Sequence, residues 1–376
     1  MAVVKFEDVA TRVNTKEDRH NTDLVYYVGG DHIDSESLKV SKRGIIKGAP
    51  LGPMFYFGFK PGDILFVTRN PHLRKCAVVD FAGICSEKTL VIATKDETVL
   101  CQKYLAGVMQ SDDFWDFLEE NKSGSVNYFI NWSTLAEYEF DLPPIEEQRA
   151  LTEKLWAAND LKEKYQHLLS ATDEMLKAKF REIFPFDQMD WPLLGFDDFA
   201  LIDATMTTDY EKYADFPHIG IDSIESGTGE LKGYRTVRED HVISGKYIFG
   251  PQHIVYSKIR PNMNKVALPD FEGLCSADSY PILVKSNCDR HFLAYVLRSS
   301  LFLDYIVPMS SRSNMPKVNR EQISGFKMKL PPIELQREFV AIANAAEASK
   351  AELKKSITSI DAVMNGLING CEIARS

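Results

Sequence analysis

Two long segments of the chain carry apolar residues at alternating steps of three and four. The first stripe runs from Leu151 to Ile183 and includes Leu161 and Leu168. The second runs from Phe339 to Leu367, and Lys350 interrupts it. Steps of three and four over five turns or more are typical of the seam of a coiled coil. The pattern therefore predicts two long helices that pack on each other, most simply in antiparallel orientation.

The segments that precede these helices have the composition of short β-strands and turns. GDILFVT (62–68) and HIVYSKI (253–259) combine β-branched and aromatic residues after a glycine or a polar turn. Such segments read as strands. Each long helix is therefore predicted to follow a globular part of mixed short strands and turns.

Nearly the same ten residues open both predicted helices. LPPIEEQRAL occupies residues 142–151 and LPPIELQREF occupies residues 330–339, with seven identical positions. Prolines suit a first helical turn, where the missing N–H costs nothing, and the glutamates place negative charge at the positive end of the helix dipole. We interpret the proline, isoleucine and glutamine of these LPPIE boxes as architectural residues with no chemistry of their own.

Further segments recur in the same order. KCAVVDFAGICS (75–86) matches KVALPDFEGLCS (265–276), and VGGDHIDS (28–35) matches IGIDSIES (219–226), while the offset drifts only from 188 to 191 along the chain. Ordered matches at a nearly fixed offset predict an internal duplication.

The duplication predicts four segments and an α+β fold class. Two globular mixed α/β domains, separated by a two-helix antiparallel coiled coil, form an internal pseudo-two-fold repeat. The predicted segments are residues 1–141 and 187–329 for the two globular domains, and residues 142–186 and 330–376 for the two long helices.

Composition points to a soluble protein. Hydrophobic residues make up 44% of the 376 residues and charged residues 26%, as in globular domains. No apolar run approaches a membrane span, and acidic residues stand where a signal peptide needs an apolar core. We expect a cytoplasmic protein with no membrane partner. None of the six cysteines forms a C-x-x-C pair, so buried thiols are favoured over a zinc site.

The net charge of −10 argues mildly against a nucleic-acid partner, because phosphate binding usually needs a basic surface. The total does not describe how the charge is distributed, however. Local basic loops would reduce this objection.

The order, doubling and spacing of the blocks together resemble the DNA specificity subunit of type I restriction-modification enzymes. The resemblance rests on the LPPIE boxes, on the segments GICS and GLCS, and on the segments VGGDHIDS and IGIDSIES. It covers essentially the whole chain. It implies that each globular part is a target recognition domain that reads one half of a split DNA sequence. It also implies that the helices act as a ruler and that the chain has no catalysis of its own.

The resemblance implies a set of partners as well. These are double-stranded DNA, two methyltransferase subunits that dock on the helices, and restriction or translocase subunits that join through the complex. No cofactor or metal is expected on this chain, and S-adenosylmethionine is expected on the methyltransferase subunit.

Polar and basic side chains on exposed loops are the candidates for reading DNA, because base edges and phosphates are recognised by such groups. Two strips rich in Gly, Ser and Asn precede the LPPIE boxes at matching places. In the first half the candidates are Lys42, Arg43, Lys47, Arg69, Arg74, Lys122, Ser123, Ser125 and Asn127. In the second half they are Arg235, Arg238, Lys258, Arg260, Asn262, Asn264, Ser311, Arg312, Ser313, Asn314 and Lys317.

Enzyme motifs are weak or missing in the sequence. SGTGE (226–230) looks like a cofactor loop, but its counterpart SESLK (35–39) has no glycine. An amino-methyltransferase would need Asn or Asp before Pro-Pro and an aromatic residue after it, where both boxes carry Leu-Pro-Pro-Ile. No Walker loop, G-x-S-x-G or H-E-x-x-H is present. The chain is therefore expected not to be an enzyme.

Two alternatives stay open. A coiled-coil adaptor that binds proteins would explain the acidic charge and the helices, but not the paired strips with basic neighbours. An orphan or regulatory specificity subunit would share every feature described so far.

Overall fold

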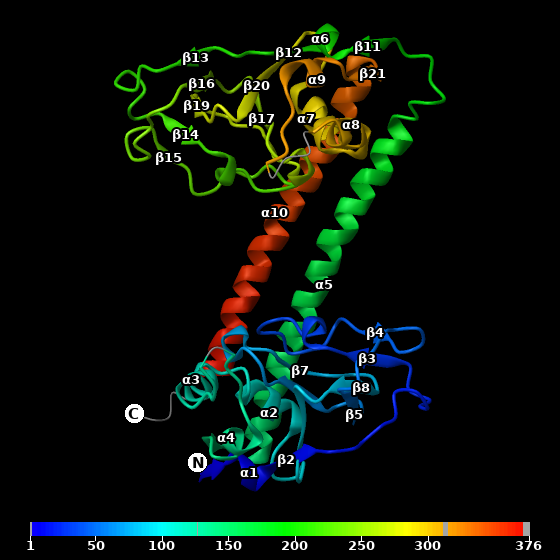
Figure 1. The fold of residues 1–376 in the computed structure, drawn as a ribbon, viewed down its shortest axis with the longest axis vertical. Helices are drawn as coiled ribbons and strands as arrows, with labels where there is room; N and C mark the ends of the chain where they lie inside the picture. Colours follow the sequence, from blue (N-terminus) through cyan, green and yellow to red (C-terminus); the bar gives the residue numbers. More distant parts are fainter. Residues whose placement is uncertain (1, 126, 311–314, 371–376) are drawn as a thin grey trace. The chain divides into compact units, whose positions relative to one another are not determined.

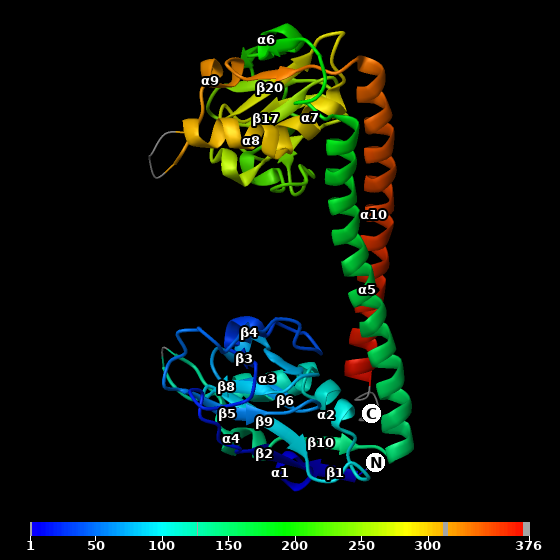
Figure 2. The same cartoon turned by 90° about the vertical axis from the view of Figure 1, so that its right-hand side faces the viewer.

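A computed structural model describes residues 2–125, 127–310 and 315–370. The chain divides into two compact units. The first unit combines residues up to Leu169 with residues from Glu352 onward, and the second consists of residues 170–351. Each unit therefore contains a globular part and segments of both long helices, α5 and α10 (Figures 1 and 2).

The two long helices begin inside the LPPIE boxes. Helix α5 spans Ile145–Ile183 and helix α10 spans Ile333–Asn369. The carbonyl of the second proline of each box accepts the first helical bonds, because Gln148 N donates to Pro144 O at 3.1 Å and Gln336 N donates to Pro332 O at 3.2 Å. The second proline thus directly precedes the helix, while the preceding strands end at Leu142 and Lys329.

The globular part of the first unit contains two four-stranded sheets and one two-stranded pair. One sheet has the order β2(Ala10–Val13)-β9(Thr89–Thr94)-β6(Ile64–Val67)-β7(Cys76–Val78), the other has the order β4(Gly44–Ile45)-β3(Tyr26–Val28)-β8(Gly83–Ser86)-β5(Phe55–Phe59), and β1(Ala2–Lys5) pairs with β10(Glu139–Leu142). The helices are α1(Phe6–Val9), α2(Gln102–Val108), α3(Asp112–Glu120) and α4(Trp132–Ala136), with 3-10 turns η1(Gly30–His32) and η2(Pro71–Leu73).

The globular part of the second unit has the corresponding elements. Its sheets have the orders β12(Ala200–Ile202)-β20(Ser279–Val284)-β17(Ile254–Ser257)-β18(Val266–Ala267) and β13(Met206–Thr207)-β16(Lys246–Phe249)-β19(Gly273–Cys275)-β14(Pro217–Ile219)-β15(Arg235–Thr236), and β11(Leu193–Gly195) pairs with β21(Lys327–Lys329). The helical elements are α6(Phe196–Phe199), α7(Arg290–Arg298), α8(Ser300–Ile306), α9(Arg320–Ser324), η3(Ile221–Ser223), η4(Pro261–Met263) and η5(Val307–Met309).

The two globular parts share one strand topology. In each, the strand order of the first sheet is the same, and the second sheet contains one parallel pair, β3 with β8 or β14 with β19, among antiparallel neighbours. The strands expected in GDILFVT and HIVYSKI are confirmed as β6 and β17. Both are central strands, which explains why they are apolar on both faces.

The long helices contribute side chains to both hydrophobic cores. In the first unit, Leu155 and Trp156 of α5 and Met364 of α10 join the core. In the second unit, Phe180 of α5 and Phe339 of α10 do the same. Burying a large apolar side chain contributes about 1.5–3 kcal/mol, so these residues anchor each globular part to its helix segments.

Within each unit the α5 and α10 segments run antiparallel, but the stripe differs from the expected one. Lys162 Nζ lies 2.6 Å from Asp361 Oδ1 in the first unit, and Lys350 Nζ lies 2.7 Å from Asp173 Oδ1 in the second. Lys350 thus faces α5 as part of an ion pair. Leu161 and Leu168, expected in the seam, are instead 40% and 50% exposed. Steps of three and four do not decide which of two neighbouring positions faces the partner helix. In α5, positions other than Leu161 and Leu168 face inward.

Among the described residues, no single helix is long and apolar enough to cross a membrane. One bent pair, Arg290–Arg298 with Ser300–Met309, passes on length and composition alone, with a bend of 57°. Its apolar side chains, including Phe292 and Phe302, fill the core of the second unit.

Candidate nucleic-acid interface

A strand, a 3-10 turn and a second strand recur in both units. We call residues 68–74 the first candidate loop and residues 258–264 the second candidate loop. Each turn is flanked by two residues in the left-handed region, Asn70 (φ 54°) and Arg74 (φ 48°) in one, Arg260 (φ 47°) and Asn264 (φ 52°) in the other. Such conformations cost on the order of 1–3 kcal/mol each and cluster at functional sites. The repeated strain makes these loops candidates for function.

The strip before the first LPPIE box folds back on the first candidate loop. Ser123 and Phe129 exchange two backbone hydrogen bonds of 3.0 Å, and Asn70 N donates to Tyr128 O at 3.1 Å. Gly124 closes the hairpin at φ +99°, where an added Cβ would lie 2.7 Å from Asn127 O. The hairpin therefore holds residues 123–125 and 127–129 beside the loop.

Basic side chains meet aromatic rings on this surface. The Arg69 guanidinium lies 5.0 Å from the centre of the Phe129 ring, and Lys122 Nζ lies 4.4 Å from that of Tyr128. Ser125 and Asn127 are exposed in the same hairpin. The structure thus brings Arg69, Lys122, Ser123, Ser125 and Asn127 together. Basic groups interleaved with aromatic rings are typical of nucleic-acid surfaces.

The second unit builds its matching surface from different residues. Ile259 and Lys317 form a β-bridge, Arg260 N donates to Pro316 O at 2.6 Å, and Val318 N donates to Lys258 O at 2.9 Å. Residues 315–318 therefore lie against the second candidate loop. Lys258, Arg260 and Lys317 come together there.

Lys258 also contacts an aromatic ring and is partly desolvated. Its Nζ lies 4.9 Å from the centre of the Tyr280 ring. Burial lowers the pKa of Lys258, and the nearby charge of Lys317 lowers it further, while Asp278 opposes both. An anion placed here would therefore gain from two neighbouring cations. The remaining strip candidates, Ser311, Arg312, Ser313 and Asn314, lie outside the described residues.

A second group of candidates lies on the edge of the other sheet. Lys42 Nζ pairs with Asp34 Oδ1 at 2.5 Å, and the Arg43 guanidinium lies 4.2 Å from the centre of the Tyr26 ring. Lys47 is exposed just after β4. In the second unit, Arg235 belongs to the matching edge strand β15, and Arg238 Nη2 lies 3.4 Å from Asp215 Oδ1. Among the residues that the structure describes, no hydrogen bond or ion pair joins this group to the candidate loops.

The last residue of each candidate loop points back into its own unit. Arg74 pairs with Asp112 at 2.5 Å, and Asn264 Nδ2 donates to Arg298 O at 2.9 Å. Asn262 is exposed within η4. Of the loop candidates, Arg69, Lys258 and Arg260 therefore lie beside the strips, while Arg74 and Asn264 take part in contacts with the chain itself.

Acidic side chains gather in another part of the first unit. A concavity of about 430 Å³ is lined by carboxylates and two aromatic residues. Its lining residues are Asp113, Asp116, Phe117, Glu120, Glu137, Tyr138 and Glu139. Part of the negative net charge is thus concentrated in this concavity, and Glu119 of the same helix α3 pairs with Lys122 at 2.5 Å.

Two aromatic residues of these surfaces, Phe129 and Tyr280, were missed. Phe129 directly follows the strip 122–128, which itself ends with Tyr128, so interleaved basic and aromatic residues could have identified it. Tyr280 lies on β20, far along the chain from the strip that it supports. No sequence signal marks it.

Metal ligation and thiol chemistry find no support in the part of the chain that the structure describes. No group of three or more His, Cys, Asp or Glu side chains there could hold a metal ion. Burial raises the pKa of the Cys85 and Cys275 thiols to about 12, so both are protonated and inert at neutral pH.

Comparisons with known proteins point in one direction. Residues 197–360 match the type I restriction modification DNA specificity domain. A stretch of 197 residues is 34% identical to the type I restriction enzyme EcoDI specificity subunit of Escherichia coli, and covers 52% of this chain and 44% of that protein. The match thus spans less than half of that relative's length.

Two solved structures share the fold along the chain. One was described in work on complex assembly and conformational transition of the type I R-M system, with a TM-score of 0.52, 18% identity and 98% of each chain covered. The other is the S subunit of a type I restriction-modification system from M. genitalium, with a TM-score of 0.64, 12% identity, and 98% and 95% of the two chains covered. At these identities they show a shared mixed α/β fold.

The family match and the curated relative go further than the fold. Residues 197–360 are similar to the type I restriction modification DNA specificity domain, and the curated relative is itself a type I specificity subunit. The resemblance read from the LPPIE boxes is thereby confirmed.

Proposed function

We propose that this chain is the sequence-specific DNA-recognition subunit of a type I restriction-modification complex, and that each unit reads one half of a bipartite target. One observation carries the proposal. The same kind of surface, a strained loop with a basic strip folded against it, is built twice from different side chains. Arg69 supplies the charge in the first unit, beside Lys122, which already pairs with Glu119 at 2.5 Å. Lys258, Arg260 and Lys317 supply the charge in the second unit.

The chemistry of these surfaces suits duplex DNA. Arginine and lysine donate to phosphates and to guanine edges, while asparagine pairs with adenine. Because the polar residues of the two surfaces differ, the two half-sites differ in sequence. The candidates at the sheet edges, Arg43 and Arg235 among them, extend each surface in this proposal.

The long helices set the spacing of the half-sites. At 1.5 Å per residue, the 39 residues of α5 and the 37 residues of α10 give lengths of about 58 and 56 Å. We propose that they form an antiparallel coiled coil that relates the units by a pseudo-two-fold axis. The antiparallel ion pairs Lys162–Asp361 and Lys350–Asp173 support this arrangement within each unit.

A face of α5 in the first unit offers a docking surface for methyltransferase subunits. Ala157, Leu161, Lys164 and Leu168 follow steps of four and three and are all exposed. A helix of a partner subunit would pair with such a stripe. In this proposal, catalysis and S-adenosylmethionine reside on two methyltransferase subunits, restriction subunits join through the complex, and this chain contributes recognition alone.

Mapping of methylated sites in DNA from cells with and without this gene tests the proposal. A bipartite motif with two unlike halves, present only when the gene is present, is the expected result. A change in a single undivided motif would contradict two-unit reading. If purified protein with its methyltransferase subunit gave no salt-dependent DNA shift, the adaptor alternative would replace the proposal.

A further inference from the structure

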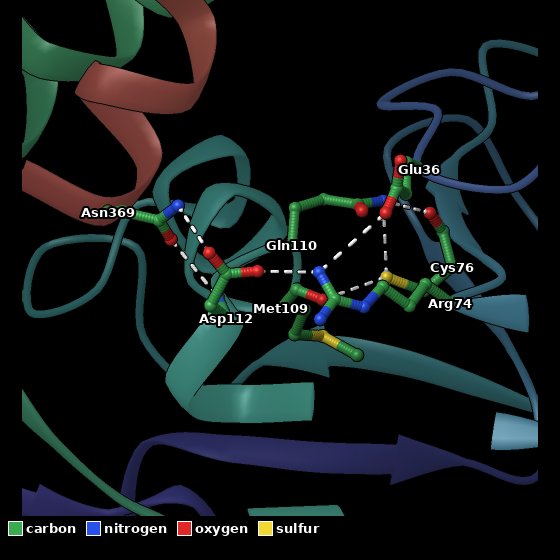
Figure 3. A network of polar contacts seen from close by, with 7 residues as sticks. All are labelled: Glu36, Arg74, Cys76, Met109, Gln110, Asp112 and Asn369. Atoms are coloured by element: carbon green, nitrogen blue, oxygen red, sulfur yellow. Dashed lines mark hydrogen bonds and ion pairs between the residues drawn. The ribbon is translucent and has the colours of Figure 1, made fainter. Parts of the chain in front are cut away.

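Arg74 occupies a corner where three parts of the first unit meet (Figure 3). Its Nη1 donates to Asp112 Oδ1 at 2.5 Å and lies 3.6 Å from Glu36 Oε1. Asp112 opens α3, and Asn369 closes α10. Asn369 Nδ2 donates to Asp112 Oδ2 at 2.8 Å, and Asp112 N donates to Asn369 Oδ1 at 3.0 Å. The end of the first candidate loop is thus connected to the last turn of α10.

The backbone around this corner is fixed from the other side as well. Glu36 N donates to Arg74 O at 3.1 Å, and Gln110 Nε2 donates to Cys76 O at 2.6 Å and to Ser37 O at 2.9 Å. Glu36 and Arg74 both have positive φ. Such a conformation persists only where surrounding contacts over-determine it. The corner is therefore built to hold one geometry.

The positive charge of Arg74 is already neutralised by carboxylates of the same unit. Its side chain is 29% exposed and lies between the carboxylates of Glu36 and Asp112. A phosphate contact would have to replace an ion pair of 2.5 Å, whereas Arg69 at the other end of the loop is exposed. Arg69 and Arg74 therefore belong to the same loop, but only Arg69 is available to contact DNA.

We infer that Arg74 is a positioning residue that fixes the first candidate loop to the last turn of α10 through Asp112 and Asn369. The register of Arg69 and of the strip 123–129 on DNA follows from this link. The inference rests on the proposed function, since it concerns how the same surface is held. It assigns Arg74 a role different from the DNA contact that its sequence position favours.

Three variants and one control separate positioning from direct contact. Arg74→Gln removes the charge, and Asn369→Ala removes the connection to α10. Asp112→Ala removes the carboxylate at 2.5 Å and leaves Arg74 with Glu36 alone, at 3.6 Å. Arg149→Gln is the control, because Arg149 is an exposed arginine of the same unit with an ion pair of 3.0 Å to Glu146. Binding is measured with the methyltransferase subunit present.

The probes are a duplex with the mapped bipartite site and two duplexes with one half-site scrambled. All three variants should lose affinity for the intact duplex by about tenfold or more, the scale of a hydrogen bond to a charged group. Discrimination against a scrambled second half-site should persist, and the salt slope should not change. Arg149→Gln should behave like the unmodified protein.

A direct phosphate contact would give a different pattern. Arg74→Gln would then lower the salt slope by about one, while Asp112→Ala would keep or raise affinity by releasing the arginine from Asp112. That pattern overturns the inference.

Hydrogen exchange of the full chain without DNA gives a second, independent readout. Asn369→Ala should speed amide exchange in residues 68–74, although Asn369 is remote in sequence. Unchanged exchange there would also overturn the inference. Failure of the unmodified protein to bind the intact duplex would instead count against the proposed function, and the exchange result would still decide whether Asn369 holds the loop.

Discussion

The corner around Arg74 in the first unit and the corner around Asn264 in the second keep the same backbone but use it differently. Glu36 N donates to Arg74 O at 3.1 Å, and Gly227 N donates to Asn264 O at 2.9 Å. Both loop residues are left-handed. The side chains then diverge, because Arg74 reaches Asp112 whereas Asn264 caps the carbonyl of Arg298 at 2.9 Å.

The corner of the second unit borders a large space. A cavity of about 1090 Å³ adjoins Asn264, which is one of many lining residues that also include Arg181, Ser300 and Asp304. Ser300 opens α8 as Asp112 opens α3, and Arg181 lies in the last turn of α5 as Asn369 lies in that of α10. The buried Asn264 Oδ1 has no hydrogen-bond partner. The duplication therefore preserved the loop but not its link to the helix.

The LPPIE boxes show the opposite behaviour. Gln148 Oε1 accepts from Cys101 N at 2.9 Å, and its Nε2 donates to Val99 O and Pro143 O. Gln336 repeats the set with Asp289 N, Asn287 O and Pro331 O. Both side chains are fully buried. The architectural interpretation of the box glutamine is confirmed. Where a globular part joins its helix the chemistry is held constant, and where a loop faces its surroundings it varies.

Exchange of one globular part gives the largest expected effect. Replacing residues 1–141 with the matching part of a relative should change one half-site completely and leave the other intact, because each candidate surface lies within one unit. Methylation mapping of cells that carry the hybrid would show this. If both half-sites changed together, the two units would not read independently.

Removal of either box glutamine tests the constant part of the comparison. Gln148→Leu leaves two carbonyls and one N–H buried without partners, at about 1–3 kcal/mol each, so a loss of about 3–5 kcal/mol is expected. Gln336→Leu should cost a similar amount, because its hydrogen bonds are the same. Urea unfolding measures both, with exposed Gln252→Leu as the control. A large cost for one and none for the other would break the equivalence.

Rebuilding the first corner in the second unit is expected to have a smaller effect. Asn264→Arg with Ser300→Asp would place an ion pair in the cavity. A hydrogen bond to a charged group contributes about 1.5–3 kcal/mol, and loss of the favourable left-handed asparagine offsets about 1 kcal/mol. A net gain of about 1 kcal/mol is expected in thermal unfolding. Asn264→Arg alone lacks the carboxylate and should not stabilise. Equal results for the single and double variants would show that no pair forms.

These comparisons also show how far the sequence could lead. The box prolines and the steps of three and four were sufficient to locate α5 and α10, because helix starts and seams depend on local spacing. The inner face of α5 was not determined, since Leu161 and Leu168 compete with neighbours one residue away. The role of Arg74 was out of reach, because its partners Glu36, Asp112 and Asn369 are distant in sequence. Arg69 of the first candidate loop and Lys122 of the strip could be found because basic residues stand beside Ser or Asn in the sequence.

The smallest expected effect concerns a turn that the two units close with different side chains. Lys60 N donates to Asp63 Oδ2 at 2.9 Å, and Gly250 N donates to His253 Nδ1 at the same distance. Burial raises the pKa of Asp63, although the bond from Lys60 opposes the shift. The native state therefore holds the Asp63 proton more tightly than the unfolded state, and stability falls as pH rises through that raised pKa.

Asp63→Asn keeps an acceptor for Lys60 N–H and removes the buried charge, so it should stabilise the first unit at neutral pH. The gain should shrink as pH is lowered toward the ordinary carboxyl pKa, where Asp63 itself is protonated. Asp203→Asn is a control of opposite sign, because hydrogen bonds from Thr205, above all, and then His253 lower the pKa of Asp203. Its ionised form stabilises the second unit, and that contribution is lost as pH falls through the lowered pKa. Thermal unfolding of both variants across this pH range should give differences of opposite sign that converge at low pH. A gain for Asp63→Asn that does not depend on pH would contradict this expectation. It would mean that folding does not change the pKa of Asp63.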